Sequence, residues 1–198
     1  MNGRPLAGRY SELVLASTSS ARRALMTSLG IPFRALAPGV DEVVAEGTAV
    51  KDAVAMLAER KARAIVKQLS QALVIGSDQL VSLDGRALGK PHDALEAFTQ
   101  LKSLAGRSHD ICTAVCVVGP GFHATEVDLA RLTIHPLSDG EIQRYVDTNE
   151  WQGCAGGYRV EARGQALFAR IDGDRTAIQG LPMLRLTRLL REARVEFF

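Results

Sequence analysis

The sequence has only three cysteines and no apolar run near the roughly 20 residues that a membrane-spanning helix needs. The N-terminal residues, MNGRPLAGRY, lack the hydrophobic segment of a secretory signal peptide. Cys112 and Cys116 fall in one expected strand, about 13 Å apart at a rise of ~3.3 Å per residue, which is too far for a disulfide. We therefore expect a soluble, cytoplasmic protein with reduced thiols and no membrane partner.

Net charge is low, because 24 Lys and Arg oppose 22 Asp and Glu, and this argues against a nucleic-acid partner. The sequence also lacks a phosphate-binding GxxxxGK[ST] loop, a dinucleotide fingerprint and histidines at zinc-ligand spacing. Its 198 residues, 46% of them hydrophobic, suffice for a core without disulfides. We predict a single domain over residues 1–198, in which residues 1–11 form a flexible N-terminal extension.

Hydrophobic patterning predicts alternating strands and helices. A Ser138-Asp139-Gly140-Glu141 capping box is expected to open a helix. The predicted strands are 13–16, 32–37, 73–76, 109–118, 123–135, 158–161 and 166–171, and the longer predicted helices are 48–69, 93–104 and 182–194. This order favours an α/β fold with a mixed sheet flanked by helices.

The junction between the first strand and the next helix is typical of an anion site. Ser17 and Ser19 supply hydroxyls where a helix begins, although serine is also an ordinary N-cap. Arg22 and Arg23 in the first turn oppose the helix dipole, so their presence needs another reason. A bound phosphate supplies that reason, because a guanidinium can grip two of its oxygens.

Lysine is scarce, and two of the five lysines stand in unusual places. Lys61 lies on the apolar face of the helix 48–69, where its stem either reaches to water or aims a cation at an anionic ligand. Lys90 stands in a Gly-Lys-Pro loop. Asp78 follows the strand 73–76, where it either starts a turn or serves as a base or metal ligand, with Glu42 as a second metal carboxylate. Such a set suits metal-assisted phosphoanhydride chemistry.

These residues lie in motifs that together resemble the Maf family of nucleoside triphosphate pyrophosphatases. The resemblance covers about residues 12–194. The motifs are Ala16-Ser17-Thr18-Ser19-Ser20-Ala21-Arg22-Arg23, Val40-Asp41-Glu42, Lys61-Ala62, Gly76-Ser77-Asp78-Gln79, Gly89-Lys90-Pro91, Cys154-Ala155-Gly156 and Gly180-Leu181-Pro182.

The resemblance implies a Maf/ITPase-like α/β fold with a cleft between two lobes, a cytoplasmic homodimer and a divalent metal, Mg or Mn. The implied reaction is hydrolysis of a nucleoside triphosphate to the monophosphate and pyrophosphate. Asp78 then matches the family's proton acceptor and, with Glu42, the metal ligands. The matching catalytic and phosphate-handling positions are Ser17, Arg22, Lys61 and Lys90.

Within the family, the motifs resemble the 7-methyl-GTP branch. Gln79 replaces the threonine of an Asp-Thr pair, and Glu161 stands where the dTTP/UTP branch carries glutamine. A carboxylate suits the positive charge of 7-methylguanine, whereas Ala21 replaces an aromatic residue that would stack on that base. A dTTP, UTP or modified-pyrimidine pyrophosphatase is the alternative substrate class. A catalytically silent nucleotide-binding regulator of cell division is the alternative of another class.

Overall fold

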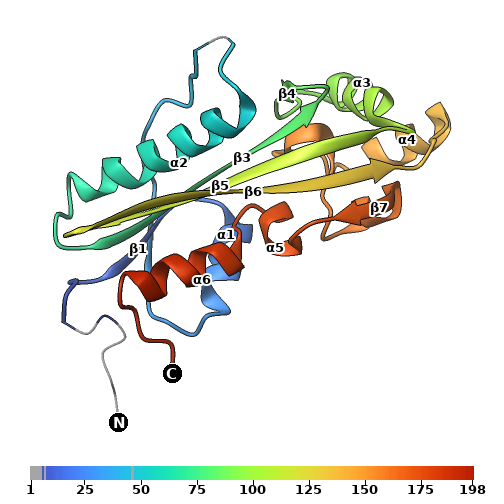
Figure 1. Ribbon diagram of the computed structural model, residues 1–198. Helices are drawn as coiled ribbons and strands as arrows, with labels where there is room; N and C mark the ends of the chain where they lie inside the picture. The colour runs from blue at the N-terminus through green and yellow to red at the C-terminus, as the bar shows by residue number, and fades with distance from the viewer. Residues whose placement is uncertain (1–5, 7, 46) are drawn as a thin grey trace. The chain divides into compact units, whose positions relative to one another are not determined.

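The structure is a computed structural model that describes residues 6, 8–45 and 47–198 (Figure 1). Its elements, in chain order, are β1 (Leu13–Ala16), α1 (Ser20–Thr27), β2 (Arg34–Leu36), α2 (Val50–Val66), β3 (Leu73–Leu83), β4 (Arg86–Leu88), α3 (Ala94–Leu104), β5 (Ser108–Gly119), β6 (Phe122–Ile134), α4 (Asp139–Val146), the 3-10 turns η1 (Ala155–Gly157) and η2 (Arg163–Leu167), β7 (Phe168–Asp172), α5 (Arg175–Ile178) and α6 (Met183–Glu192). None of these helices is long and apolar enough to cross a membrane.

The strands form one mixed sheet in the order β2-β1-β3-β5-β6-β7, and β4 pairs with β3 off this path. β1 is parallel to both β2 and β3, with Leu13 opposite Leu73, whereas β6 is antiparallel to β7. The predicted α/β class with a mixed sheet and flanking helices is therefore confirmed. Since β1 is buried at every position, its apolar run reflects cover on both faces of the sheet.

The chain divides into two compact units. The first comprises the described residues up to Gln79 together with 113–128 and 175–198, and the second comprises 80–112 and 129–174. The prediction of a single domain over 1–198 and the prediction of a cleft between two lobes stay predictions. Residues 1–5 and 7 of the predicted flexible extension lie outside the described residues. Within this segment Tyr10 is buried and Arg9 donates to the Gly121 carbonyl, and the predicted flexible extension over residues 1–11 stays a prediction.

Helices cover both faces of the sheet in the first unit. α2 lies on one face, and α1 and α6 lie on the other (Figure 1). Residues at helical spacing on α6, among them Leu186 and Leu190, pack with Leu15 and Ile75 of the strands in the main core cluster. On the other face, α2 buries an alanine-rich stripe that includes Lys61.

The predicted end of a strand at Gly76 is wrong, because β3 continues without a break to Leu83. Beyond the segment that pairs with β1, residues 81–83 of β3 pair with β4 through a tight turn. Asp84 and Gly85 both have positive φ angles, 51° and 80°, as a two-residue hairpin turn requires. Asp78 therefore lies within a strand, just past its parallel pairing.

The second unit confirms the Ser138 capping box at the start of α4 but not the predicted strand at 158–161. Gly156 and Gly157 have positive φ angles of 75° and 73°, which turn the backbone. The amide of Arg159 then donates to the hydroxyl of Tyr145 rather than to a neighbouring strand. The Tyr145 hydroxyl thus satisfies a backbone amide that would otherwise pair with a neighbouring strand, and the segment 158–161 forms no strand.

Candidate active site

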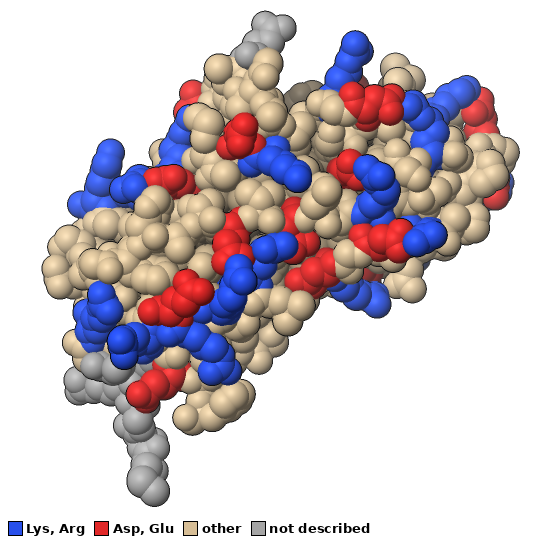
Figure 2. Space-filling view, viewed as in Figure 1, with Lys and Arg blue, Asp and Glu red and all other residues tan. Residues whose placement is uncertain are grey.

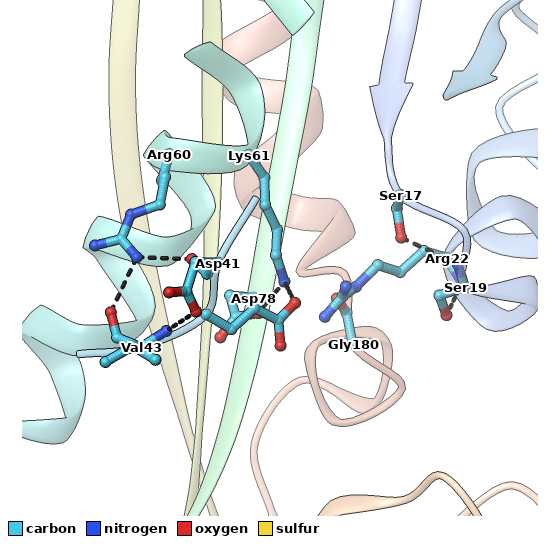
Figure 3. A network of polar contacts seen from close by, with 10 residues as sticks. Ser17, Ser19, Arg22, Asp41, Val43, Arg60, Lys61, Asp78 and Gly180 are labelled. Atoms are coloured by element: carbon cyan, nitrogen blue, oxygen red, sulfur yellow. Dashed lines mark hydrogen bonds and ion pairs between the residues drawn. The ribbon is translucent and has the colours of Figure 1, made fainter. Parts of the chain in front are cut away.

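A buried lysine joins two carboxylates in the first unit. The Lys61 ammonium lies 2.5 Å from Oδ1 of Asp78 and 2.6 Å from Oε1 of Glu42. The side chains of Lys61 and Asp78 are 6% and 8% exposed, whereas Glu42, on the loop before α2, is 59% exposed. Figure 3 shows Lys61 and Asp78 pointing toward one another from α2 and β3. The Lys61 ammonium therefore does not reach to water but pairs with two carboxylates of the protein, and its contact with an anionic ligand stays a prediction.

The absence of a side chain at Gly76 allows α2 to lie close to β3. A Cβ atom at Gly76 would lie 2.1 Å from the Ala58 carbonyl oxygen and 2.8 Å from the Ala62 amide nitrogen. Any other residue would push the helix away from the strand. Lys61 is next to Ala62 in α2, and Asp78 lies two residues after Gly76 in β3. The close approach that Gly76 permits therefore brings their charges together.

The strand-to-helix junction holds Arg22 in place on the same unit. The Ser19 hydroxyl caps α1 by accepting from the Arg22 amide at 3.4 Å, and the buried Ser17 hydroxyl accepts from the Ser19 amide at 3.1 Å. Both serines thus brace the turn whether or not they also contact a ligand. Burial lowers the pKa of the Arg22 guanidinium, and the carboxylates of Asp78 and Glu42 oppose that shift.

Arg22 is oriented by a distant carbonyl. Its Nε atom donates to the Gly180 oxygen at 2.7 Å, across 158 positions of the chain (Figure 3). The Ser77 hydroxyl lies 2.9 Å from the same oxygen and can donate to it. Gly180 has a φ of 105°, a conformation that glycine adopts readily. This role of Gly180 was not among the predictions made from the sequence, in which the Gly-Leu-Pro motif is the only local signal for it.

Gln79 serves a local structural purpose. Its amide nitrogen lies 3.0 Å from the Thr113 hydroxyl oxygen and 2.8 Å and 2.9 Å from the carbonyl oxygens of Ala177 and Ile178. Successive side chains of a strand point to opposite faces, so Gln79 holds α5 on one face while Asp78 meets Lys61 on the other. A contact between Gln79 and the base stays a prediction.

The predicted residues Lys90 and Glu161 belong to the second unit, where they lie around Cys154. Burial raises the pKa of the Cys154 thiol, while the nearby cations of Arg159 and Lys90 lower it and Glu161 raises it. The Gly156 amide donates to the Gly89 carbonyl at 3.3 Å, which ties the Gly-Lys-Pro loop to η1. Arg159 lies 3.8 Å from the Glu161 carboxylate. A cation and a carboxylate thus lie side by side in this part of the second unit.

The predicted residues divide between the two units. Ser17, Arg22, Glu42, Lys61 and Asp78 belong to the first unit, whereas Lys90 and Glu161 belong to the second. Arg23 is exposed on α1, and Ala21 of the same helix is half-buried. The roles of all these residues in binding and catalysis stay predictions.

Residues 12–193 match the family described as Maf-like protein. The chain belongs to the Maf family. It is 42% identical to a 7-methyl-GTP pyrophosphatase of Xanthomonas oryzae over 91% of this chain and 96% of that one. It is 38% identical to a dTTP/UTP pyrophosphatase of Bacillus velezensis over 93% and 97%, and 43% identical to a nucleoside triphosphate pyrophosphatase of Rhodopseudomonas palustris over 92% and 94%.

One solved structure, the Ham1 protein of Staphylococcus aureus, is 19% identical to this Maf protein. It aligns with a TM-score of 0.45 over 64% of this chain and 73% of that one, a likeness too weak to carry an argument.

Proposed function

We propose that this Maf protein is a nucleoside triphosphate pyrophosphatase that hydrolyses the anhydride between the α and β phosphates. The observation that carries the proposal is the buried Lys61 ammonium, which lies between the carboxylates of Glu42 and Asp78. The same two carboxylates also act on the Arg22 guanidinium, where they oppose the lowering of its pKa by burial. Enzymes that cleave phosphoanhydrides use cationic side chains to bind the phosphates and carboxylates to bind the metal and the attacking water. Relatives that bear pyrophosphatase names and align over more than nine-tenths of the chain support it.

In the proposed reaction, Arg22 and Lys61 neutralise phosphate oxygens, and the family resemblance assigns a phosphate-handling role to Lys90 as well. Asp78 accepts a proton from a water molecule whose oxygen attacks the α-phosphorus. The bond from the α-phosphorus to the bridging oxygen breaks, and its electron pair leaves with pyrophosphate. The products are a nucleoside monophosphate and pyrophosphate, and the cations stabilise the charge that develops on the leaving group.

The residues fit a divalent cation of the Mg or Mn type. Glu42 and Asp78 direct oxygens at one point, which the Lys61 ammonium shares. Among the described residues no group of three or more His, Cys, Asp or Glu side chains gathers around a common point. Mg²⁺ is commonly held by one or two carboxylates together with substrate phosphates, which matches this pair. When bound, the cation would stabilise negative charge on the oxygens of the triphosphate.

For the substrate, we propose 7-methyl-GTP. The support is the Cys154-Ala155-Gly156 motif with Glu161 downstream, since a carboxylate favours the positively charged base. Ala21 offers no ring for stacking, so the negative charge of the Glu161 carboxylate is the feature that carries the preference. Named 7-methyl-GTP pyrophosphatases and dTTP/UTP pyrophosphatases are about equally similar to the chain, which makes a pyrimidine triphosphate the second candidate.

The test is pyrophosphate release from a panel of GTP, 7-methyl-GTP, UTP, dTTP and methylated pyrimidine triphosphates, with and without Mg²⁺ or Mn²⁺. We expect metal-dependent release with the highest kcat/KM for 7-methyl-GTP. A higher value for UTP or dTTP would replace the substrate assignment and leave the reaction intact. Nucleotide binding without any release would favour a catalytically silent regulator of cell division.

The distribution of charge on the surface indicates which kinds of partner the protein can bind. On the face shown in Figure 2, Lys and Arg side chains are intermixed with Asp and Glu. An intermixed surface favours recognition by individual side chains over attachment to a nucleic-acid backbone. From the family resemblance we further propose a cytoplasmic homodimer, and analytical ultracentrifugation of the purified protein measures its oligomeric state directly.

A further inference from the structure

Arg60 grips the backbone of the loop that carries Glu42. Its Nη1 atom donates to the Asp41 carbonyl at 2.7 Å and to the Val43 carbonyl at 2.9 Å. The two hydrogens of one guanidinium nitrogen thus reach the carbonyls of the residues before and after Glu42 (Figure 3). The Asp41 carboxylate closes the turn by accepting from the Val43 amide at 3.0 Å.

The residues around Glu42 are exposed rather than packed in the core. Residues 41–43 are all exposed, with Val43 70% exposed, and they form neither helix nor strand. In an exposed segment, hydrogen bonds contribute much of the order of the backbone. Hydrogen bonds from a charged donor are the stronger kind, so the contacts from Arg60 are well suited to fix the backbone that carries Glu42.

The two ends of Glu42 are held by consecutive residues of one helix. Arg60 holds the backbone on either side of Glu42, and Lys61 holds its carboxylate at 2.6 Å. α2 itself is anchored by its close packing on β3. The bonds from Arg60 and Lys61 therefore fix the position of the loop relative to the sheet. By its place in the helical pattern, Arg60 belongs to the solvated side of α2, and its sequence position gives no sign of this contact.

We propose that Arg60 is a positioning residue that sets the direction of the Glu42 carboxylate for a divalent metal. The proposal rests on the proposed function, in which Glu42 and Asp78 hold that metal. Arg60 acts through the loop carbonyls and is assigned no contact with substrate. Residues that orient metal ligands commonly change metal affinity or activity by about 10- to 100-fold when they are replaced.

Mn²⁺ binding tests the proposal through the loss of the free-ion EPR signal, measured with and without inorganic pyrophosphate. We expect Arg60→Ala to raise the Kd for Mn²⁺ by about tenfold, and Arg60→Lys, which keeps a charged donor, to give an intermediate value. Arg63→Ala is the matched control, because Arg63 stands one turn along α2 but pairs with Glu59 at 2.6 Å. The control is expected to bind Mn²⁺ as the wild type does.

A double-mutant cycle separates positioning from a general structural role. If Arg60 acts through Glu42, then Arg60→Ala has no further effect on the Mn²⁺ Kd in a Glu42→Gln protein. We also expect the thermal midpoint of Arg60→Ala to stay within about 2 °C of the wild type, since the contacts are exposed. An equal effect of Arg60→Ala in both backgrounds would overturn the inference.

The failure of the proposed function gives a different result. Wild-type protein that binds no Mn²⁺ and releases no pyrophosphate would overturn the proposed function together with this inference. Wild-type protein that does both, alongside an Arg60→Ala protein with the same Mn²⁺ Kd, would overturn the inference alone.

Discussion

Lys61 and Asp78 form a buried ion pair with 2.5 Å between the ammonium nitrogen and Oδ1, although they lie on different elements. Taking both charges out of water is costly, and the pair offsets that cost only while both members are present. Buried charges with a specific partner are common at functional sites. The pair therefore yields two separate predictions, one for activity and one for stability.

Replacement of the Asp78 carboxylate tests the proposed base. We expect Asp78→Asn to lower kcat for pyrophosphate release by about 10²- to 10⁴-fold, the usual contribution of a general base. Asp110→Asn is the control, because Asp110 pairs with exposed Arg131 in the second unit and is expected to leave kcat unchanged. Full metal-dependent release by Asp78→Asn would show that another group activates water.

Removal of the Lys61 ammonium tests the cost of an unpaired buried charge. We expect Lys61→Met to reduce the free energy of unfolding by about 3 kcal/mol, because the Asp78 carboxylate is left buried without its cation. Adding Asp78→Asn should restore part of that loss. Urea unfolding measures both variants, with Lys102→Met in its exposed pair with Asp139 as a control expected to change by less than about 1 kcal/mol. A double variant less stable than Lys61→Met would contradict the argument.

The bond from Arg22 to the Gly180 carbonyl predicts a binding defect. A Cβ atom at Gly180 would lie 3.4 Å from Nε of Arg22, in a backbone conformation with a φ of 105°. We expect Gly180→Ala to raise KM for the triphosphate by about tenfold as the guanidinium shifts. Gly30→Ala is the control, because Gly30 also has a positive φ, 68°, but nothing lies within 4 Å of its Cβ position. Equal KM values for the two variants would contradict the proposed role of Arg22 in binding the triphosphate.

His109 predicts how stability depends on pH. It is 2% exposed, its Nε2 lies 2.6 Å from the Tyr158 hydroxyl, and its Nδ1 has no partner within the described residues. Burial lowers the pKa of His109 to about 4, against the opposing pull of Asp110. Because the unfolded chain takes up this proton near pH 6.5 and the folded protein only near pH 4, stability falls as pH drops through that window.

The expected loss from His109 amounts to at most about 3 kcal/mol between pH 7 and pH 4. Urea unfolding across this range should show a smaller loss for His109→Gln than for the wild type. His135→Gln, at an exposed histidine, should follow the wild-type curve. Identical curves for all three proteins would mean that His109 titrates alike in the folded and unfolded states.

Local patterns predicted the elements of this protein well, because they depend on what each residue buries. The apolar run at β1, the helical stripe of α2 and the Ser138 capping box all appear in the structure. The placement of Lys61 on the apolar face was also visible in the pattern. Where the pattern was misleading, at the β3 extension and at residues 158–161, pairing with a hairpin or with a Tyr145 hydroxyl decided the backbone.

Local patterns and motifs thus predict the mixed α/β class, the family and which charges stand in unfavourable places. What those charges contact becomes visible only in the folded chain: Lys61 pairs with Asp78, Arg22 with Gly180, and Arg60 with the loop that carries Glu42. Burial is a local property that periodicity records, whereas an ion pair or a carbonyl contact depends on how closely two distant segments approach, and here a glycine without a side chain sets that approach.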